Sequence, residues 1–75
     1  MQIVKDIKLT VRETEVLYAM AYGMTDIEIA KEFKISKYTV SGHRKKIITK
    51  FNAKNSCQSI YLACLSGYID FNRHA

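Results

Sequence analysis

The segment at residues 35–51 reads ISKYTVSGHRKKIITKF and predicts a helix with two different faces. Ser36 is a favourable N-cap residue, because its hydroxyl can accept a backbone N–H of the first turn. Val40, Ile47 and Phe51 recur at helical spacing and form one apolar stripe. The opposite face carries polar, cationic or small residues, which are Lys37, Tyr38, Ser41, Gly42, Lys45 and Thr49.

A helix that is apolar on one side, and cationic with small residues on the other, suits the major groove of DNA. The competing interpretation is an ordinary amphipathic helix whose basic face is simply solvated. This segment alone is compatible with both interpretations.

The chain has 75 residues and two cysteines, which limits its size and its chemistry. One domain of this length buries only about 60% of its unfolded surface, so its stability is marginal. Cys57 and Cys64 are two turns apart on one predicted helix, which is too far for a disulfide. We expect both to be small core residues in a reducing cytoplasm, with no metal site and no cofactor.

No apolar run in the chain is long enough to cross a bilayer, and the N-terminus lacks the apolar region of a signal peptide. The sequence therefore predicts an intracellular, cytoplasmic protein. A membrane surface is a rival partner for the basic segment, but it favours an exposed helix with apolar residues opposite the charge. Here the apolar side is needed for a core, so we expect no membrane partner.

The net charge of +5 is unevenly distributed along the chain. The acidic residues of the first part are Asp6, Glu13, Glu15, Asp26, Glu28 and Glu32. No acid occurs from residue 33 to residue 69, a segment that contains Lys34, Lys37, Arg44, Lys45, Lys46, Lys50 and Lys54. Concentrating one sign of charge on one segment creates a local field that attracts a polyanion.

Two capping boxes predict the first two helices. Thr10 and Glu13 form a capping box before a helix expected over residues 11–22, and Gly23 suits the left-handed position after it. Its inward side chains are expected to be Val16, Leu17, Met20 and Ala21. A second box is followed by a helix over residues 26–34, whose buried side is expected to be Ile29, Ala30 and Phe33.

The second capping box consists of Thr25 and Glu28. Only a tight turn then separates the helix at residues 26–34 from the basic helix at residues 37–51. Two short helices at this spacing, with the second one basic, match a helix-turn-helix.

A fourth helix is expected over residues 57–66, ending at Gly67. Either Asn55 together with Gln58, or Ser56 alone, is expected to cap it. Because the helix is apolar on almost all sides, the spacing of apolar residues does not identify which side faces the core. We expect that face to consist of Ile60, Ala63 and Cys64.

Three residues near this helix are then left outside the predicted core, namely Tyr61, Leu65 and Tyr68. An exposed apolar patch often marks a partner surface. The alternative is that the extended arm at residues 1–8 or the tail at residues 68–75 covers these side chains.

Together the motifs resemble the LuxR-type (GerE-like) helix-turn-helix domain of bacterial transcription regulators. The resemblance is carried by LTVRETEVL at 9–17, AYG at 21–23, EIA at 28–30, ISKYTVSGH at 35–43 and IITKF at 47–51. It implies one all-α domain over residues 1–75, a four-helix bundle containing a helix-turn-helix, with a four-helix core at residues 9–67. It also implies that the third helix recognises DNA and that the fourth forms a dimer on a two-fold operator.

The resemblance assigns roles residue by residue. Base recognition falls to Ser41, Gly42 and Lys45, with Tyr38 and Arg44 near the edge, and Lys45 is expected to bind guanine O6 and N7. Phosphate contacts fall to Thr25, Ser36, Thr39 and Lys50. Charge adds Lys37, Arg44, Lys46 and Lys54 as phosphate contacts. The dimer interface is expected to involve Tyr61, Leu65 and Tyr68.

Four positions differ from the family pattern or have no clear role in it. Asp26 occupies a position where the family often has Asn, and Ser56 one where Arg is common, so each removes a potential phosphate contact. Gly42 costs about 1 kcal/mol in a helix interior, which indicates either a close approach to a base or loss of use. The sequence offers no residues that could form a catalytic or metal site with His43, so this histidine is expected to contact phosphate or to pack against the core.

These observations favour a sequence-specific transcription regulator of the bacterial nucleoid that binds double-stranded DNA as a homodimer, with RNA polymerase or another regulator as a further partner. The alternative is a protein-interaction module that uses the helix-turn-helix fold as a docking platform. An enzyme is disfavoured, because the sequence lacks a phosphate-binding loop, a carboxylate pair and metal-ligand spacing. The sequence does not distinguish a stand-alone protein from the C-terminal part of a longer one.

Overall fold

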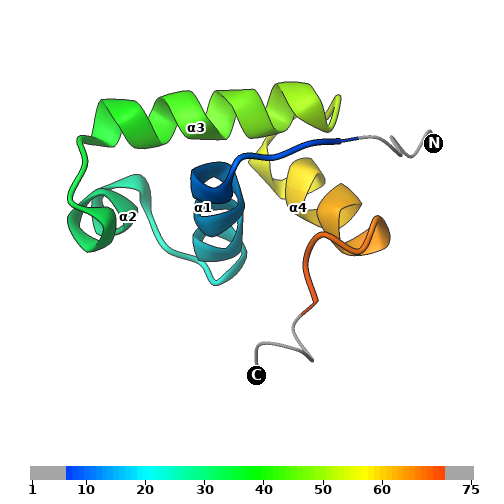
Figure 1. Cartoon of the computed structure of the whole chain (residues 1–75), viewed down its shortest axis with the longest axis horizontal. Coiled ribbons are helices and arrows are strands. Elements are labelled where there is room, and N and C mark those ends of the chain that lie inside the picture. The colour runs from blue at the N-terminus through cyan, green and yellow to red at the C-terminus, as the bar shows by residue number, and fades with distance from the viewer. Residues whose placement is uncertain (1–6, 71–75) are drawn as a thin grey trace.

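The computed structural model describes residues 7–70, which fold into four helices without a strand in that range. The helices are α1 (Val11–Ala21), α2 (Asp26–Phe33), α3 (Lys37–Lys50) and α4 (Ser56–Leu65). Helix α3 packs against each of the other three, and α1 also packs against α4. In Figure 1, α1, α2 and α4 all lie on the same side of α3. The predicted all-α, four-helix architecture is confirmed, while residues 1–6 of the predicted arm and 71–75 of the tail lie outside the described residues.

Both predicted capping boxes are present at the start of α1 and α2. Thr10 Oγ1 accepts the N–H of Glu13 at 3.1 Å, and Glu13 Oε1 accepts the N–H of Thr10 at 3.0 Å. Thr25 and Glu28 make the same reciprocal pair at 3.2 and 2.8 Å. Helix α1 ends one residue earlier than predicted, and Gly23 follows it with a φ of 89°. These local hydrogen bonds explain why the sequence located both helix starts correctly.

A sharp turn joins α2 to α3. Lys34 adopts a left-handed conformation with φ 57°, so α2 stops one residue before the predicted end. The N–H of Ile35 then donates to the carbonyl of Ala30 at 3.0 Å, which satisfies one of the last carbonyls of α2. Ser36 caps α3 as predicted. The turn is therefore short enough to form the predicted helix-turn-helix.

The loop between α3 and α4 contains a second left-handed residue, Asn52, with φ 52°. Of the two predicted caps for α4, the first is present, because Asn55 Oδ1 accepts the N–H of Gln58 at 2.9 Å. Gln58 Oε1 reaches one residue further back and accepts the N–H of Lys54 at 2.6 Å. Helix α4 consequently begins at Ser56, one residue earlier than predicted.

The core contains apolar residues from all four helices and from both flanking segments. The predicted stripe of Val40, Ile47 and Phe51 is fully buried. Ile7 and Ile69, which lie outside the helices, are buried as well. The buried apolar set is Ile7, Val16, Leu17, Ala19, Met20, Ile29, Val40, Ile47, Phe51, Leu62, Ala63 and Ile69.

The predicted inward face of α4 is partly wrong. Ala63 is buried, but Ile60 is only partly buried and Cys64 is exposed, while Ser59 and Leu62 are buried in their place. The hydroxyl of Ser59 donates to a backbone carbonyl one turn earlier at 2.7 Å, which satisfies it within the core. Because α4 is apolar on nearly every side, periodicity did not identify the packed face.

Further burial predictions fail. On α2, Ile29 is buried as predicted, but Ala30 and Phe33 are only partly buried. Cys57 and Cys64 are both exposed free cysteines, because they lie on the outer side of α4 and not in the core. On α1, Ala21 is only partly buried and Ala19 is buried, since this helix packs against both α3 and α4. No helix within residues 7–70 combines the length and the apolar character needed to span a bilayer.

Ile47→Ala tests how strongly the fold depends on the packing of α3. Since Ile47 is fully buried, the free energy of unfolding is expected to fall by roughly 2–5 kcal/mol. Ile27 is a matched control on an exposed surface, and Ile27→Ala is expected to change the free energy by no more than about 0.5 kcal/mol. Urea unfolding followed by circular dichroism measures both, and equal losses would contradict the assigned core.

Candidate nucleic-acid interface

The outward face of α3 is open over its whole length. Tyr38, Gly42, Lys45 and Thr49 are all exposed, and their i, i+4, i+7, i+11 spacing aligns them along the helix. Ser41 lies on the flank of this row and is half-buried. Figure 1 shows no other helix on this side of α3. The four predicted base-recognition residues therefore share one accessible surface.

The N-terminal end of α3 is suited to an anion. Ser36 Oγ accepts the N–H of Thr39 at 3.0 Å and lies 3.0 Å from the Thr39 hydroxyl. Lys37 Nζ is 5.5 Å from the centroid of the Tyr38 ring, a cation–π distance. The first turns of α1 and α2 contain acidic residues, but that of α3 contains none. The positive end of the α3 dipole is therefore not compensated locally.

The other N-cap assigned to phosphate, Thr25, is exposed at the start of α2. Its hydroxyl and backbone N–H are both engaged with Glu28. The hydrogen bond from the Thr25 backbone N–H to the Glu28 carboxylate is the main cause that holds the pKa of Glu28 below its ordinary value, and the Thr25 side chain contributes less. The Thr25 hydroxyl therefore serves Glu28 within the domain, and its contact with phosphate stays a prediction.

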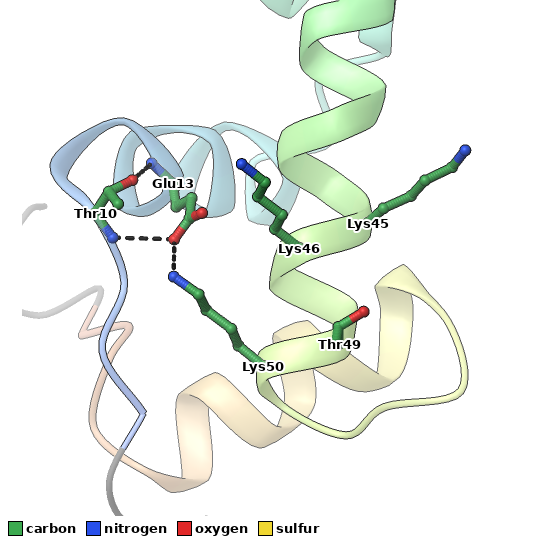
Figure 2. Close-up of a pocket in the computed structure, with 6 residues that line it drawn as sticks. All are labelled: Thr10, Glu13, Lys45, Lys46, Thr49 and Lys50. Carbon is green, nitrogen blue, oxygen red and sulfur yellow. Dashed lines mark hydrogen bonds and ion pairs between the residues drawn. The ribbon is translucent and has the colours of Figure 1, made fainter.

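A groove of about 510 Å³ runs between the start of α1 and the C-terminal half of α3. It is lined by Thr10, Glu13, Lys45, Lys46, Thr49 and Lys50. Figure 2 shows Lys46 extending toward the start of α1, whereas Lys45 extends away from it. Both lysines are exposed, as is Lys54 in the following loop. Within residues 7–70, no ion pair involves Lys37, Lys45 or Lys46.

Lys50 is engaged inside the domain. Its Nζ donates to Glu13 Oε1 at 2.6 Å and to the backbone carbonyl of Lys8 at 2.9 Å. Glu13 is only 3% exposed, and the same oxygen accepts the N–H of Thr10, as Figure 2 shows. This carboxylate thus joins the start of α1 to the end of α3, and a phosphate contact by Lys50 stays a prediction.

The environment of Glu13 favours its charged form. Burial raises the pKa of this carboxyl group, but the hydrogen bonds from Lys50 and Thr10 and the charges of Lys50 and Lys46 lower it by more. The pKa of Glu13 therefore lies below its ordinary value of 4.5. A buried carboxylate is tolerated only when it is paired and hydrogen-bonded, as it is here.

Arg44 is also paired with a carboxylate from the first part of the chain. Its Nη2 forms a hydrogen-bonded ion pair with Asp26 Oδ1, which links α3 to the first turn of α2. The Nε of Arg44 is buried and has no hydrogen-bond acceptor within the described residues. His43, next to it on α3, is half-buried on the helix flank.

The outer side of α4 carries a row of exposed residues. Tyr61 is 50% and Leu65 is 47% exposed. Cys57 and Cys64 lie on the same side of the helix and are exposed too. Residues 7–70 leave Tyr61 and Leu65 exposed, but most of the arm and of the tail lies outside that range. Whether these side chains form a partner surface or are covered by the arm or the tail therefore stays a prediction.

Tyr68, the third residue assigned to the dimer interface, has a different environment. It is half-buried, and its ring packs edge-on against Phe51 with centroids 5.6 Å apart. Its backbone carbonyl accepts the hydroxyl of Tyr18 at 3.1 Å. Tyr68 therefore belongs largely to the wall of the core, and a role in dimerisation stays a prediction.

Residues 8–63 match the family described as GerE, bacterial regulatory proteins of the luxR family. The chain belongs to the LuxR family. This family consists of transcription regulators and not of enzymes, as the sequence motifs predicted. The match spans all of α1, α2 and α3 and most of α4.

Similar sequences occur in Bacillus subtilis and Escherichia coli. The transcriptional regulatory protein YxjL of Bacillus subtilis is 38% identical over 60 residues, which cover 80% of this chain and 28% of YxjL. The regulatory protein SdiA of Escherichia coli is 41% identical over 58 residues, which cover 77% of this chain and 24% of SdiA. The chain therefore spans less than a third of the length of these LuxR-family relatives.

Solved structures of LuxR-family proteins have the same fold. The VqmA dimer of Vibrio cholerae, solved in the absence of target DNA, has a TM-score of 0.81 and 41% identity over 84% of this chain and 28% of its own. A crystal structure of Escherichia coli SdiA also has a TM-score of 0.81, with 36% identity over 89% of this chain and 28% of its own.

Sequence reasoning missed the partners of the two interhelical ion pairs in this LuxR-family domain. The sequence patterns indicate Glu13 as a capping residue, and Asp26 as a favourable charge in a first helical turn and a departure from the family. Their partners, Lys50 and Arg44, lie 37 and 18 residues away in the chain. The only signal in the sequence was the separation of acidic and basic residues along it, which indicates attraction but does not identify pairs.

Glu13→Gln tests the interhelical carboxylate. Because the folded pKa of Glu13 is lowered, its charge stabilises the fold above pH 4.5, and this contribution is lost as the pH falls below that value. At pH 7 the variant is expected to be less stable by about 1–2 kcal/mol. The difference in Tm between parent and variant is expected to shrink from pH 7 to pH 3, and a constant difference would contradict the assignment.

Proposed function

We propose that this domain binds double-stranded DNA in a sequence-specific manner, with α3 in the major groove, and thereby regulates transcription. The observation that carries the proposal is the open outward face of α3, which presents Lys45 with exposed cations on either side of it. The named relatives are transcriptional regulators, and VqmA of Vibrio cholerae has been solved as a complex with a ligand and DNA. These likenesses support the proposal for this chain.

The dimensions of α3 fit such a groove. Its 14 residues give a length of about 21 Å at 1.5 Å per residue, and the major groove of about 12 Å width admits one α-helix. Tyr38, Ser41, Gly42 and Lys45 occupy the N-terminal two-thirds of the helix and would contact base edges. Lys45 can donate to both O6 and N7 of guanine.

Phosphate contacts would surround this row of residues. The exposed ammonium groups of Lys37, Lys46 and Lys54 supply charge, and the hydroxyls of Thr25, Ser36 and Thr39 supply hydrogen-bond donors at the helix starts. The uncompensated N-terminal end of α3 adds a favourable field for one phosphate. Arg44 and Lys50 would join this set only by sharing or leaving their carboxylate partners.

Gly42 supports a close approach between α3 and DNA. A Cβ atom at this position would meet no other atom within 4 Å, so the fold itself does not require glycine here. Glycine in a helix interior nevertheless costs about 1 kcal/mol relative to alanine. A backbone contact with a base edge or a thymine methyl group would account for that cost.

The outer side of α4 would supply a dimer interface. Tyr61 and Leu65 are large, exposed and adjacent on this helix. In a two-fold dimer the two copies of α3 would lie about 34 Å apart, one helical turn of DNA. The same exposed side favours a second candidate function, in which the domain docks onto another regulator through α4.

Lys45→Ala and Lys46→Ala form a matched pair, since both lysines are exposed and adjacent on α3. Lys45→Ala is expected to relax the base preference at one position, with a loss of roughly 1–3 kcal/mol in discrimination. Lys46→Ala is expected to weaken all duplexes alike and to reduce the slope of log K against log salt by about 0.9.

Selection of duplexes from a random pool, followed by fluorescence anisotropy at stated salt, measures both effects. Unchanged binding of every duplex by both variants would contradict the site assignment. A parent protein that binds no duplex at low salt would refute DNA binding and would favour the docking function.

Leu65→Gln tests the dimer interface. The dissociation constant of the dimer is expected to rise at least tenfold, because a buried leucine contributes about 1.5–3 kcal/mol. Ile27→Gln is the matched control, since Ile27 is similarly exposed but lies on α2. Sedimentation equilibrium measures both, and an equal effect of the two substitutions would exclude α4 as the specific interface.

A further inference from the structure

We propose that Asp26 limits the DNA affinity of this domain by competing with a DNA phosphate for the guanidinium group of Arg44. The proposal rests on the DNA binding proposed above. It assigns Asp26 a function that its position at the start of α2 does not itself imply, and it makes Arg44 a phosphate contact that is only conditionally available.

The two interhelical ion pairs within residues 7–70 differ in how exposed their carboxylates are. In the pair of Lys50 with Glu13, the carboxylate side chain is only 4% exposed. In the pair of Arg44 with Asp26, the side chains are 33% and 30% exposed. The two cations are about equally exposed, Lys50 at 34% and Arg44 at 33%, so the pairs differ in the carboxylate that a phosphate would displace. Asp26 would return to water, whereas Glu13 would be left buried without its counter-charge.

The guanidinium group of Arg44 is also incompletely satisfied. An arginine has five N–H donors in a planar fork. Only Nη2 is hydrogen-bonded to Asp26, and Nε is buried without an acceptor within the described residues. Nη1 is therefore the second donor that a phosphate could use together with Nη2. A phosphate can accept two parallel hydrogen bonds from such a fork, which a single carboxylate oxygen does not do. The existing pair is therefore one that a phosphate can replace.

The position of Arg44 is appropriate for a backbone contact. Lys37, Ser41 and Arg44 follow one another at i, i+4 and i+7 and therefore share one flank of α3. Asp26 adjoins this flank directly after Thr25, itself predicted to contact phosphate. A phosphate bound here would meet two cations on α3 and one competing carboxylate on α2. Removal of that carboxylate frees Arg44 while leaving the core unchanged.

A double-mutant cycle with Asp26→Asn and Arg44→Gln tests this competition. Anisotropy titrations with the selected duplex give the affinity at several salt concentrations for the parent, each single variant and the double variant. Asp26→Asn is expected to bind about tenfold more tightly, with a slope of log K against log salt that is steeper by about 0.9. Arg44→Gln alone is expected to stay within twofold of the parent, and the double variant is expected to lose the gain.

Glu32→Gln is the matched control, because Glu32 is exposed on the same helix and forms no ion pair within residues 7–70. It makes the same charge change and is expected to leave the affinity within twofold. A gain equal to that of Asp26→Asn would overturn the proposal, since net charge would then explain the effect. A gain that persists in the double variant would also overturn it, because Asp26 would then only repel phosphate.

Thermal unfolding establishes that each variant is folded before its affinity is compared. If Arg44→Gln does not fold, Arg44→Met replaces it and keeps an unbranched apolar stem in the same packing. Failure of the parent to bind any duplex would refute the proposed function and this inference together. Normal binding by the parent with independent effects of the two substitutions would refute this inference alone.

Discussion

The burial of one face of α3 against three other helices is the constraint on which the rest of the molecule depends. Val40, Ile47 and Phe51 lie in the core and allow only one rotation of the helix about its axis. That rotation directs Tyr38 and Lys45 away from the domain. Any substantial turn of α3 would bury cations and expose three large apolar side chains, and both changes are costly. The packing therefore determines which residues a ligand can reach.

The same packing brings the acidic and basic parts of the chain together. Glu13 on α1 and Asp26 on α2 each pair with a cation of α3. The field of the basic segment is consequently weaker than its sequence indicates, because two of its charges are neutralised within the domain. What remains at the surface of α3 is a smaller set of exposed lysines near the row that faces outward.

The sequence predicted those parts of the structure that depend on neighbouring residues. The capping boxes of Thr10 and Thr25, together with the N-cap at Ser36, located the first three helix starts, because each is a hydrogen bond across three residues. Prediction failed where contacts between distant segments determine which side chains are buried or paired. Cys64 was predicted to face the core but is exposed, because nearly all of α4 is apolar and its spacing does not identify the buried side. The ion pair between Arg44 and Asp26 joins residues far apart in the chain and has no local sequence pattern.

One carboxylate oxygen links the start of α1 to the end of α3. Glu13 Oε1 accepts both the N–H of Thr10 and the ammonium group of Lys50. If the first turn of α1 frays, α3 loses its anchor, and if α3 detaches, a buried carboxylate loses its counter-charge. Each event alone raises the free energy, so states in which only α1 or only α3 has unfolded are unfavourable. A domain this small can thus unfold cooperatively, as a single all-or-none transition.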